Sequence, residues 1–300
     1  MYKILIVGKG SAGKNHFNAL KKIRQNFLIK FISSRNLLNN FGKNSNKLKI
    51  FNPDYLIVSA PSAHHLKFIR IFEKIFKNKT ILIEKPLFDK SKSRLKKMKN
   101  RYFVGYNMRH HPVLKFIKRY IKGKKIFFVN SECFTYLPDW RITDYRKTVS
   151  AQKKLGGGVL LELSHEIDYL IWLLGNLKIK YCYNKKISNL RINCDDILCL
   201  NAASNKKVIV NLNLNFFSRI EKRQILINGK DFSILGDLRK NNITLVENYK
   251  KRFVNFKDYK ISESYKKENL DLIKRNYLTN CTLREAMNVQ KIIEKIRLFT

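Results

Sequence analysis

The chain begins with an apolar run that leads into a turn spaced by glycines. Residues 3–7 are rich in branched apolar side chains, a composition typical of a strand buried on both faces of a parallel sheet. After the glycines, apolar positions recur with the period of a helix, at Phe17, Leu20 and Ile23. The pattern predicts a strand, a tight turn and a helix.

The same alternation continues through the first hundred residues. Strands are predicted at residues 27–32, 54–60 and 80–83, and a helix is predicted at residues 67–76. Strands that alternate with helices of this length indicate βαβ units and a parallel sheet, which binds its ligands at the carboxyl ends of the strands. The amino-terminal part is therefore expected to be a doubly wound α/β domain.

The pattern changes after a helix predicted at residues 113–121, which ends at Gly123. Longer strands follow, at residues 126–136, 197–203, 207–217 and 224–227, and a turn is predicted at Asn228 and Gly229. The chain ends in a helix, for which Thr282 and Glu285 form a capping box. We expect two domains, residues 1–118 and residues 119–300, the second with an antiparallel sheet.

Composition limits the classes of function. The 300 residues are 44% apolar, enough for two ordinary cores, and the net charge is +40. Such a charge suggests nucleic acid, but lysine is spread over nearly every segment and the longest basic run is residues 250–252. We expect no specific nucleic-acid partner, and a positive field that favours anionic substrates and cofactors.

The cysteines and the apolar segments indicate the compartment. Five cysteines are scattered without CxxC spacing, which predicts neither disulfides nor a metal site. No segment approaches the length of a membrane span, and the first strand leaves no room for a signal peptide after Met1. The expectation is a cytoplasmic protein with no membrane partner.

The glycine spacing suits a dinucleotide. Gly8 makes the tight turn, Gly10 lets backbone approach a pyrophosphate, and Gly13 lets the helix pack closely on the strand. The amino end of the helix, with Ser11 and Ala12, offers N–H groups and a positive dipole end to the phosphates. These five residues are the first candidates for cofactor binding.

The end of the second strand bears on the choice of cofactor. An NAD site usually places a carboxylate near this point to bind the ribose 2′-OH, but the sequence has Ser33, Ser34 and Arg35. Hydroxyls followed by an arginine suit a 2′-phosphate, so NADP is favoured and NAD stays possible. The alternative is an ordinary surface arginine.

A lysine follows the predicted strand at residues 80–83. Pro86 biases Lys85 towards extended geometry, so that Lys85 would stand at the strand tip facing the cofactor crevice. In so lysine-rich a chain, a solvated side chain is the alternative.

The segment Gly156–Gly175 begins with three glycines and continues as a strongly apolar predicted helix. Gly175 is the predicted left-handed residue at which this helix ends. Glu162, His165 and Asp168 recur every three residues, which would stack them on one helix face. A histidine beside a carboxylate can exchange protons near neutral pH. The alternative is a histidine satisfied within the core.

An irregular segment at residues 137–146 combines aromatic rings with arginines. Trp140 and Tyr145 suit the apolar face of a sugar, and Arg141 and Arg146 suit an anionic group. The alternative is a surface loop of a basic protein.

Four motifs in order resemble the glucose-fructose oxidoreductase, inositol dehydrogenase and MocA (Gfo/Idh/MocA) family: GKGSAGKNH, APSAHH, IEKP and VGYNMRHHP. The resemblance implies a Rossmann domain followed by an α+β domain with an open, mostly antiparallel sheet. It places Ala60, Pro61, His65 and Glu84 at the cofactor, and it implies a substrate contact for Arg109.

The second domain also resembles the family's signature, in which glycines precede a helix bearing an aspartate, a histidine four residues on, and a further aspartate. His165 and Asp168 match. At the place of the earlier aspartate stands Leu161, with Glu162 one place later. The longer glutamate shares a helix face with that place and would replace the aspartate in function.

The leading hypothesis is an NAD(P)-dependent oxidoreductase of a sugar, sugar nucleotide or polyol, acting in surface-glycan synthesis. Lys85 and His165 are then expected to converge on one substrate hydroxyl, one as the cation and the other as the base. We also expect a homo-oligomer formed through the carboxyl-terminal sheet. The alternatives are a dinucleotide-binding sensor without turnover and, less favoured, a nucleic-acid binder.

Overall fold

The computed structural model describes residues 1–90 and 98–299. The chain forms two compact units, each built from two stretches of sequence. The first unit comprises Met1–Asn107 and Lys260–Met287, and the second comprises Met108–Tyr259 and Asn288–Thr300. Among the described residues, no helix combines the length and the apolar character needed to cross a membrane.

The first unit contains a six-stranded sheet in the order β14-β5-β4-β3-β1-β2. All neighbours are parallel except β14, which runs antiparallel to β5. Its strands are β1 (Tyr2–Val7), β2 (Phe27–Ile32), β3 (Tyr55–Val58), β4 (Thr80–Ile83), β5 (Arg101–Val104) and β14 (Cys281–Thr282). The strand order reverses between β1 and β3, which is the position where open α/β sheets bind ligands. The predicted parallel α/β domain is confirmed.

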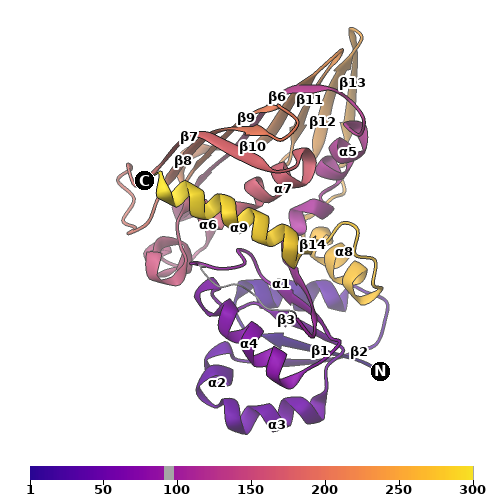
Figure 1. The fold of residues 1–300 in the computed structure, drawn as a ribbon, viewed down its shortest axis with the longest axis vertical. Coiled ribbons are helices and arrows are strands. Elements are labelled where there is room, and N and C mark those ends of the chain that lie inside the picture. The colour runs from indigo at the N-terminus through magenta and orange to yellow at the C-terminus, as the bar shows by residue number, and fades with distance from the viewer. Residues whose placement is uncertain (91–97, 300) are drawn as a thin grey trace. The chain divides into compact units, whose positions relative to one another are not determined.

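The helices of the first unit connect and cover this sheet (Figure 1). They are α1 (Ser11–Lys21), α2 (Ser34–Asn39), α3 (Phe41–Phe51), α4 (His65–Ile75) and α8 (Ile261–Ile273). The apolar residues of the central strands are fully buried because both faces of the sheet are covered. Ile4 and Ile57 pack with Leu20 of α1 and Leu272 of α8 in one core cluster.

The carboxyl-terminal stretch of this unit changes the expected domain boundaries. A single cut at residue 118 was expected, but the contacts divide the chain after Asn107 and return Lys260–Met287 to the first unit. The cause is long-range packing: α8 lies against α1, and β14 adds an antiparallel edge strand beside β5. The capping box is present, with Thr282 N donating to Glu285 Oε2 at 2.9 Å and Glu285 N donating to Thr282 Oγ1 at 3.3 Å.

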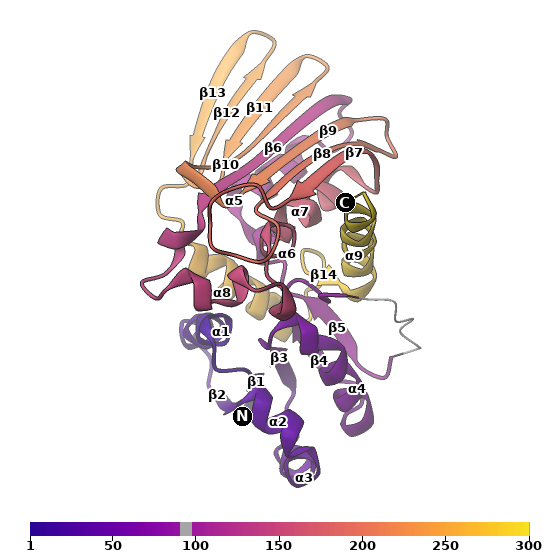
Figure 2. The ribbon, with the colours of Figure 1, turned by 90° about the vertical axis from the view of Figure 1, so that its left-hand side faces the viewer.

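The second unit contains an eight-stranded sheet in the order β13-β12-β11-β10-β6-β9-β8-β7 (Figure 2). Only β6 and β9 are parallel, so the predicted open, mostly antiparallel sheet is confirmed. The strands are β6 (Ile126–Tyr136), β7 (Leu177–Lys185), β8 (Ile197–Ser204), β9 (Ile209–Asn215), β10 (Phe217–Gly229), β11 (Phe232–Asp237), β12 (Asn242–Glu247) and β13 (Lys250–Asn255).

Two helices pack on one face of this sheet. In α5 (Pro112–Tyr120), Val113 and Ile117 approach Gly236 of β11 so closely that a Cβ there would lie 2.7 Å from Val113 Cγ1. In α7 (Ser164–Leu174), the Tyr169 hydroxyl bonds to Ser131 of β6 at 2.7 Å. The second unit also contains α6 (Val159–Glu162) and residues 288–298 of α9 (Leu283–Leu298).

Two sequence predictions in the second unit are wrong. The helix expected after Gly158 is interrupted at Leu163, because Glu166 N bonds to the carbonyl of Leu163 at 3.2 Å in place of the carbonyl of Glu162. The hairpin turn lies at residues 230–231, two residues beyond the predicted place, since Asn228 and Gly229 stay paired with β11. Gly229 is needed in that ladder because a Cβ would lie 2.1 Å from the Phe232 ring.

Candidate functional site

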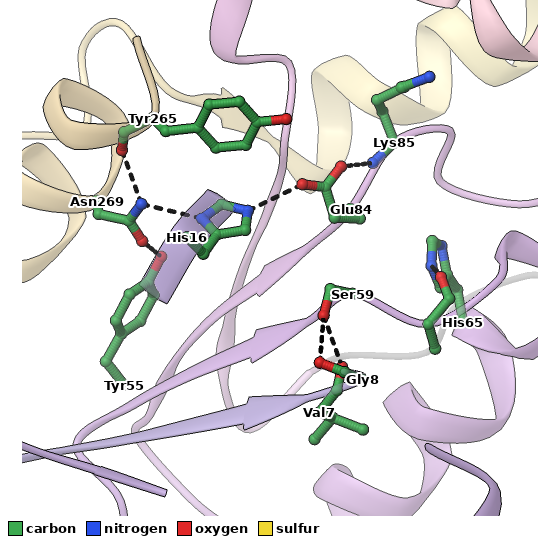
Figure 3. Close-up of polar contacts among 11 residues, drawn as sticks. Val7, Gly8, His16, Tyr55, Ser59, His65, Glu84, Lys85, Tyr265 and Asn269 are labelled. Carbon is green, nitrogen blue, oxygen red and sulfur yellow. Dashed lines mark hydrogen bonds and ion pairs between the residues drawn. The ribbon is translucent and has the colours of Figure 1, made fainter. Parts of the chain in front are cut away.

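The turn after β1 packs against the end of β3 (Figure 3). Gly8 has a φ of +110°, a conformation that glycine adopts most readily. Ser59, the residue after β3, donates its hydroxyl towards the carbonyls of Val7 at 3.0 Å and Gly8 at 3.2 Å. The turn is thus held at the point where the strand order reverses.

The other two glycines of the turn differ in what surrounds them. A Cβ on Gly13 would lie 2.3 Å from the carbonyl oxygen of Gly8, so this glycine is required for α1 to pack on the strand. A Cβ on Gly10 would meet no described atom within 4 Å, and its φ of −74° suits any residue. Gly10 is therefore not needed for packing within this unit, which fits a role in letting a ligand approach the backbone.

The phosphate-binding part of a dinucleotide site needs donors that the protein itself leaves available. Gly10 is the N-cap of α1 and has no side chain to satisfy the first-turn N–H groups of Ser11 and Ala12. The positive dipole end of this eleven-residue helix adds to the attraction for an anion. The chemistry of the turn fits a pyrophosphate.

The predicted 2′-phosphate residues lie at the start of α2. Ser33 is the N-cap, and its hydroxyl accepts a weak bond from Asn36 N at 3.4 Å. Arg35 lies in the first turn of the helix and is exposed. The guanidinium is therefore accessible to solvent at the carboxyl end of β2.

The strand tip after β4 carries a buried carboxylate. Glu84 Oε1 lies 2.8 Å from His16 Nε2, and Glu84 Oε2 accepts a bond from Lys85 N at 3.1 Å (Figure 3). Burial acts to raise the pKa of Glu84, but the hydrogen bond from His16 and the charge of Lys85 outweigh it and leave this pKa below its usual value. Glu84 is therefore a carboxylate that fixes the backbone at Lys85.

The tautomer of His16 follows from a second buried residue. Asn269 of α8 donates its amide nitrogen to the Tyr265 carbonyl, which can only accept, and its amide oxygen lies 2.9 Å from the Tyr55 hydroxyl. The same amide nitrogen lies 2.9 Å from His16 Nδ1, which must therefore be the acceptor. The proton is then on Nε2, which donates to Glu84.

Lys85 and His65 lie beside this network, Lys85 directly after β4 and His65 at the start of α4. The Lys85 side chain is half-buried and extends away from the Glu84 carboxylate (Figure 3). The ring of His65 is fully buried, with Nε2 at 2.8 Å from the Ala60 carbonyl and Nδ1 at 3.0 Å from the Pro86 carbonyl. Burial lowers the pKa of His65, although these carbonyls act to raise it. His65 therefore ties the loop after β3, which includes Pro61, to the loop after β4.

In the second unit, Arg109 and Asp168 form a buried bidentate pair. Arg109 Nε donates to Asp168 Oδ2 at 2.9 Å and Nη2 donates to Oδ1 at 2.7 Å, with both side chains 1% exposed. The predicted substrate residue Arg109 is thus engaged with the predicted catalytic residue Asp168. This pair fixes α7, the helix that carries His165, to the segment before α5.

The interruption at Leu163 separates the predicted polar stripe. Glu162 lies on α6, whereas His165 and Asp168 lie on α7. Asp195 caps α6 by accepting a bond from Leu160 N at 2.8 Å. Burial raises the pKa of Asp195, although this hydrogen bond acts in the opposite direction.

The aromatic and arginine loop is held by contacts within the second unit, some of them with residues distant in the sequence. Trp140 donates to Thr135 Oγ1 at 2.5 Å and meets Phe216 edge-on, and the Tyr145 hydroxyl accepts a bond from Arg191 N at 3.1 Å. Arg146 pairs with Asp144 at 2.8 Å. Arg141 is exposed. The loop therefore uses three of its four predicted binding residues in its own structure.

Several residues with structural roles at the site were not predicted from the sequence. Asn269 and Asp195 had no local signal, since their partners are distant in the chain. His16 stands three residues after Gly13, and its place on the inner face of α1 was the available clue. Glu166, fully buried and bonded to Arg223 at 2.7 Å, was hidden among apolar neighbours.

A match over the carboxyl-terminal part of the sequence identifies the family. The sequence profile of the Gfo/Idh/MocA oxidoreductase family, C-terminal alpha/beta domain, matches residues 124–298. This is more than half of the chain, so the protein belongs to the Gfo/Idh/MocA oxidoreductase family. No curated protein matches the sequence.

Solved structures share the fold at low sequence identity. UDP-N-acetylglucosamine 3-dehydrogenase GnnA from Acidithiobacillus ferrooxidans has a TM-score of 0.77 at 13% identity, covering 100% of this chain and 97% of that one. A levoglucosan dehydrogenase in complex with NADH has a TM-score of 0.81 at 13% identity, covering 99% and 96%. The WlbA dehydrogenase from Bordetella pertussis, in complex with NADH and UDP-GlcNAcA, has a TM-score of 0.75 at 15% identity, covering 99% and 95%.

Proposed function

We propose that the protein is an NAD(P)-dependent oxidoreductase that acts on a hydroxyl or carbonyl group of a sugar, a sugar nucleotide or a polyol. The observation that carries the proposal is the glycine turn at the carboxyl end of β1, where Gly10 alone of the three glycines has no packing role. Membership of an oxidoreductase family supports it.

The bound dinucleotide would accept or donate the hydride. We propose that Gly8, Gly10, Ser11, Ala12 and Gly13 hold its pyrophosphate, through backbone N–H groups at the start of α1. Ser33, Ser34 and Arg35 hold the 2′-phosphate of NADP, with NAD as the weaker ligand. The loops at Ala60, Pro61 and Glu84, joined by His65, complete the cofactor site.

The proton chemistry falls to Lys85 and His165. We propose that both act on the same substrate oxygen, with Lys85 supplying positive charge to a developing alkoxide and His165 exchanging the hydroxyl proton. The reverse division between the two side chains would perform the same chemistry. Glu84 is then a positioning residue for Lys85, through the bond from Lys85 N.

The second unit supplies the proposed substrate contacts. The Arg109–Asp168 pair positions α7 and hence His165, and Glu162 on α6 stands in for the family aspartate. Trp140, Arg141, Tyr145 and Arg146 form the substrate loop, in which the exposed Arg141 is best placed to meet an anionic group. An acidic or nucleotide-linked sugar of surface glycans would suit this charge, as in the relatives crystallised with UDP-GlcNAcA.

We also propose a homo-oligomer formed through the sheet of the second unit. Along β6, buried and partly exposed side chains alternate, so one face of the strand belongs to the core and the other does not. Large apolar side chains are exposed on the outer strands, among them Tyr181 at 61% and Phe253 at 61%. Sedimentation at micromolar concentration would test this.

A substrate screen tests the proposed function. Sugars, polyols and sugar nucleotides are offered with NAD or NADP, and the absorbance of the reduced nicotinamide is followed. Once a substrate is found, Lys85→Ala and His165→Ala should each lower kcat by about 10² to 10⁴ with cofactor affinity unchanged, whereas the exposed Lys77→Ala should have no effect. Near-normal kcat in His165→Ala would make that histidine structural, and cofactor binding without turnover of any substrate would favour the sensor.

A further inference from the structure

A basic cavity of about 880 Å³ opens in the second unit, and its lining includes no residue used in the proposed reaction. It is formed by the end of α5 and the turn into β6, by the last residues of α7, and by the turn between β8 and β9. These segments are far apart in the sequence. Five of the basic residues lie within residues 118–125, and the fold brings Lys206 and Lys207 beside them.

The charge of the lining exceeds what this basic chain would supply by chance. Seven of its fourteen residues are lysine or arginine, whereas lysine and arginine make up 62 of the 300 residues of the chain. Among the described residues, no aspartate or glutamate lines the cavity. The excess positive charge makes an anionic ligand the natural occupant.

Two of these basic side chains are already engaged by the protein. Lys118 donates its ammonium group to the Trp172 carbonyl, and Lys124 pairs with Glu247 at 2.5 Å. The other five are exposed at the cavity, and they are Arg119, Lys122, Lys125, Lys206 and Lys207. Like charges gathered in this way repel one another, and a multivalent anion would relieve that repulsion.

The β8–β9 turn presents its lysines in a defined conformation. Lys207 has a φ of +62°, a left-handed conformation that residues other than glycine seldom adopt. The Ser204 hydroxyl accepts bonds from Lys206 N at 3.1 Å and Val208 N at 3.3 Å, which closes the turn. Lys206 and Lys207 are thus held at the cavity by a short, well-bonded turn.

The rest of the lining is apolar. Leu173, Leu174 and Val208 are buried side chains that form part of the wall, while Phe127 keeps 48% of its surface exposed. Lys125 lies with its ammonium group 5.5 Å from the centre of the Phe127 ring. An aromatic ring beside ammonium groups suits a ligand that carries both a ring and an anionic group.

We propose that this cavity binds a phosphorylated small molecule with a ring, such as a nucleoside diphosphate. Its phosphates contact Lys122, Lys206 and their basic neighbours, and its ring lies against Phe127. The volume falls in the usual range for small-ligand sites. A cavity suits a compact ligand better than a flat bilayer, and a single cavity is too small for the extended stripe of charge that follows a nucleic-acid backbone.

The test is a calorimetric titration with ADP in a Gly10→Glu background. The substitution places a carboxylate in the glycine turn, where the fold has room for it, so that phosphate binding at that turn does not contribute. Lys122→Glu combined with Lys206→Glu removes charge from the cavity. Lys178→Glu combined with Lys180→Glu changes the net charge equally at exposed positions on β7 of the same unit.

We expect one ADP per chain, with a dissociation constant at least tenfold higher in the cavity variant and unchanged in the β7 variant. Phe127→Ala should weaken ADP but leave inorganic pyrophosphate unaffected. Equal ADP binding in the two charge variants would overturn the proposal, as would binding to phosphatidylglycerol vesicles without binding of ADP. Thermal melts of the two charge variants should coincide with that of the Gly10→Glu background, because every substituted lysine is exposed.

Discussion

Two buried carboxylates, one in each unit, are satisfied by different partners. Glu84 receives a single bond from the neutral ring of His16 and another from a backbone N–H. Asp168 receives two parallel bonds from the guanidinium of Arg109. Arginine is charged at every accessible pH, whereas the bond from His16 depends on which ring nitrogen carries the proton.

This difference indicates different roles for the two carboxylates. The Arg109–Asp168 pair is a complete ion pair with good geometry, and removal of either partner takes both of these bonds from a buried charge. Glu84 accepts its bonds from uncharged groups, with the charge of Lys85 nearby, and the donor nitrogen of His16 is set by Asn269 on α8. The first arrangement mainly holds an element in place, and the second holds the backbone at a proposed catalytic residue.

The largest effect is expected from Asp168→Asn. The substitution removes the carboxylate charge that balances the buried guanidinium of Arg109, so the free energy of unfolding should fall by about 3–5 kcal/mol. Chemical denaturation followed by circular dichroism measures this. The Asp144–Arg146 pair at the surface offers a matched control, since Asp144→Asn should leave the denaturation midpoint unchanged. Equal effects of the two substitutions would show that burial does not set the strength of the pair.

Glu84→Gln should have a smaller effect on stability and a clear effect on turnover. The amide keeps the size of the side chain but leaves buried groups imperfectly bonded, at a cost of about 1–3 kcal/mol. The amide has one acceptor oxygen where the carboxylate has two, so His16 Nε2 and Lys85 N cannot both keep their bonds. The backbone at Lys85 is then held less firmly, and kcat should fall about tenfold, a larger change than that in the KM for the cofactor. If kcat is unchanged in the folded variant, Glu84 does not position Lys85.

The pH dependence of the free energy of unfolding distinguishes the contribution of the Arg109–Asp168 pair from that of His111, two residues after Arg109. Burial, together with the charge of Arg223, lowers the pKa of His111 to about 4 in the folded protein. The unfolded chain then binds more protons below its histidine pKa of about 6.5, so the free energy of unfolding is highest above that pH and falls as the pH drops towards 4.

The slope from His111 should approach about 1.4 kcal/mol per pH unit. His111→Asn should remove this part of the slope, because asparagine does not titrate. The variant should still fold, because asparagine can cap α5 in place of the His111 ring, which accepts a bond from Val113 N. His65, whose pKa is lowered in the first unit, should supply the slope that remains. A wild-type stability that does not vary between pH 7 and pH 5 would contradict both assignments.

Arg35→Ala should leave stability unchanged, since the side chain is exposed. It should weaken NADPH by about 1.5–3 kcal/mol, the usual worth of a hydrogen bond to a charged group. NADH affinity should not change. Equal affinities of the wild type for the two dinucleotides would show that residues 33–35 do not select the phosphate.

Local patterns predicted much of the fold. The strand, the glycine turn and α1 follow from nearest-neighbour constraints on the backbone, and the Thr282–Glu285 capping box is likewise local. The interruption at Leu163, the shifted hairpin turn and the return of residues 260–287 depend on packing between distant segments. No local pattern encodes these contacts.

The candidate site likewise has features that the local sequence predicts and others that depend on the fold. The tight turn at Gly8 and the close packing at Gly13 could be predicted because the glycine spacing reflects the backbone itself, whereas the binding role of Gly10 stays a prediction. The contacts of Trp140, Tyr145 and Arg146 with their neighbours could not, because the residue types alone suit both binding and structure. The partner of Asp168 was in one of the quoted motifs, but the pairing with Arg109 required the fold.

The cofactor affinity of two alanine variants tests the central claim most directly. Gly13→Ala should lower the melting temperature, because its Cβ would lie 2.3 Å from the Gly8 carbonyl oxygen, whereas Gly10→Ala has room and should melt as the wild type does. We predict that the wild type binds NADPH and that Gly10→Ala binds it at least tenfold more weakly, although fully folded. A wild type that binds neither NADPH nor NADH, or a Gly10→Ala variant that binds as tightly as the wild type, would contradict the assignment of the glycine turn as the dinucleotide site.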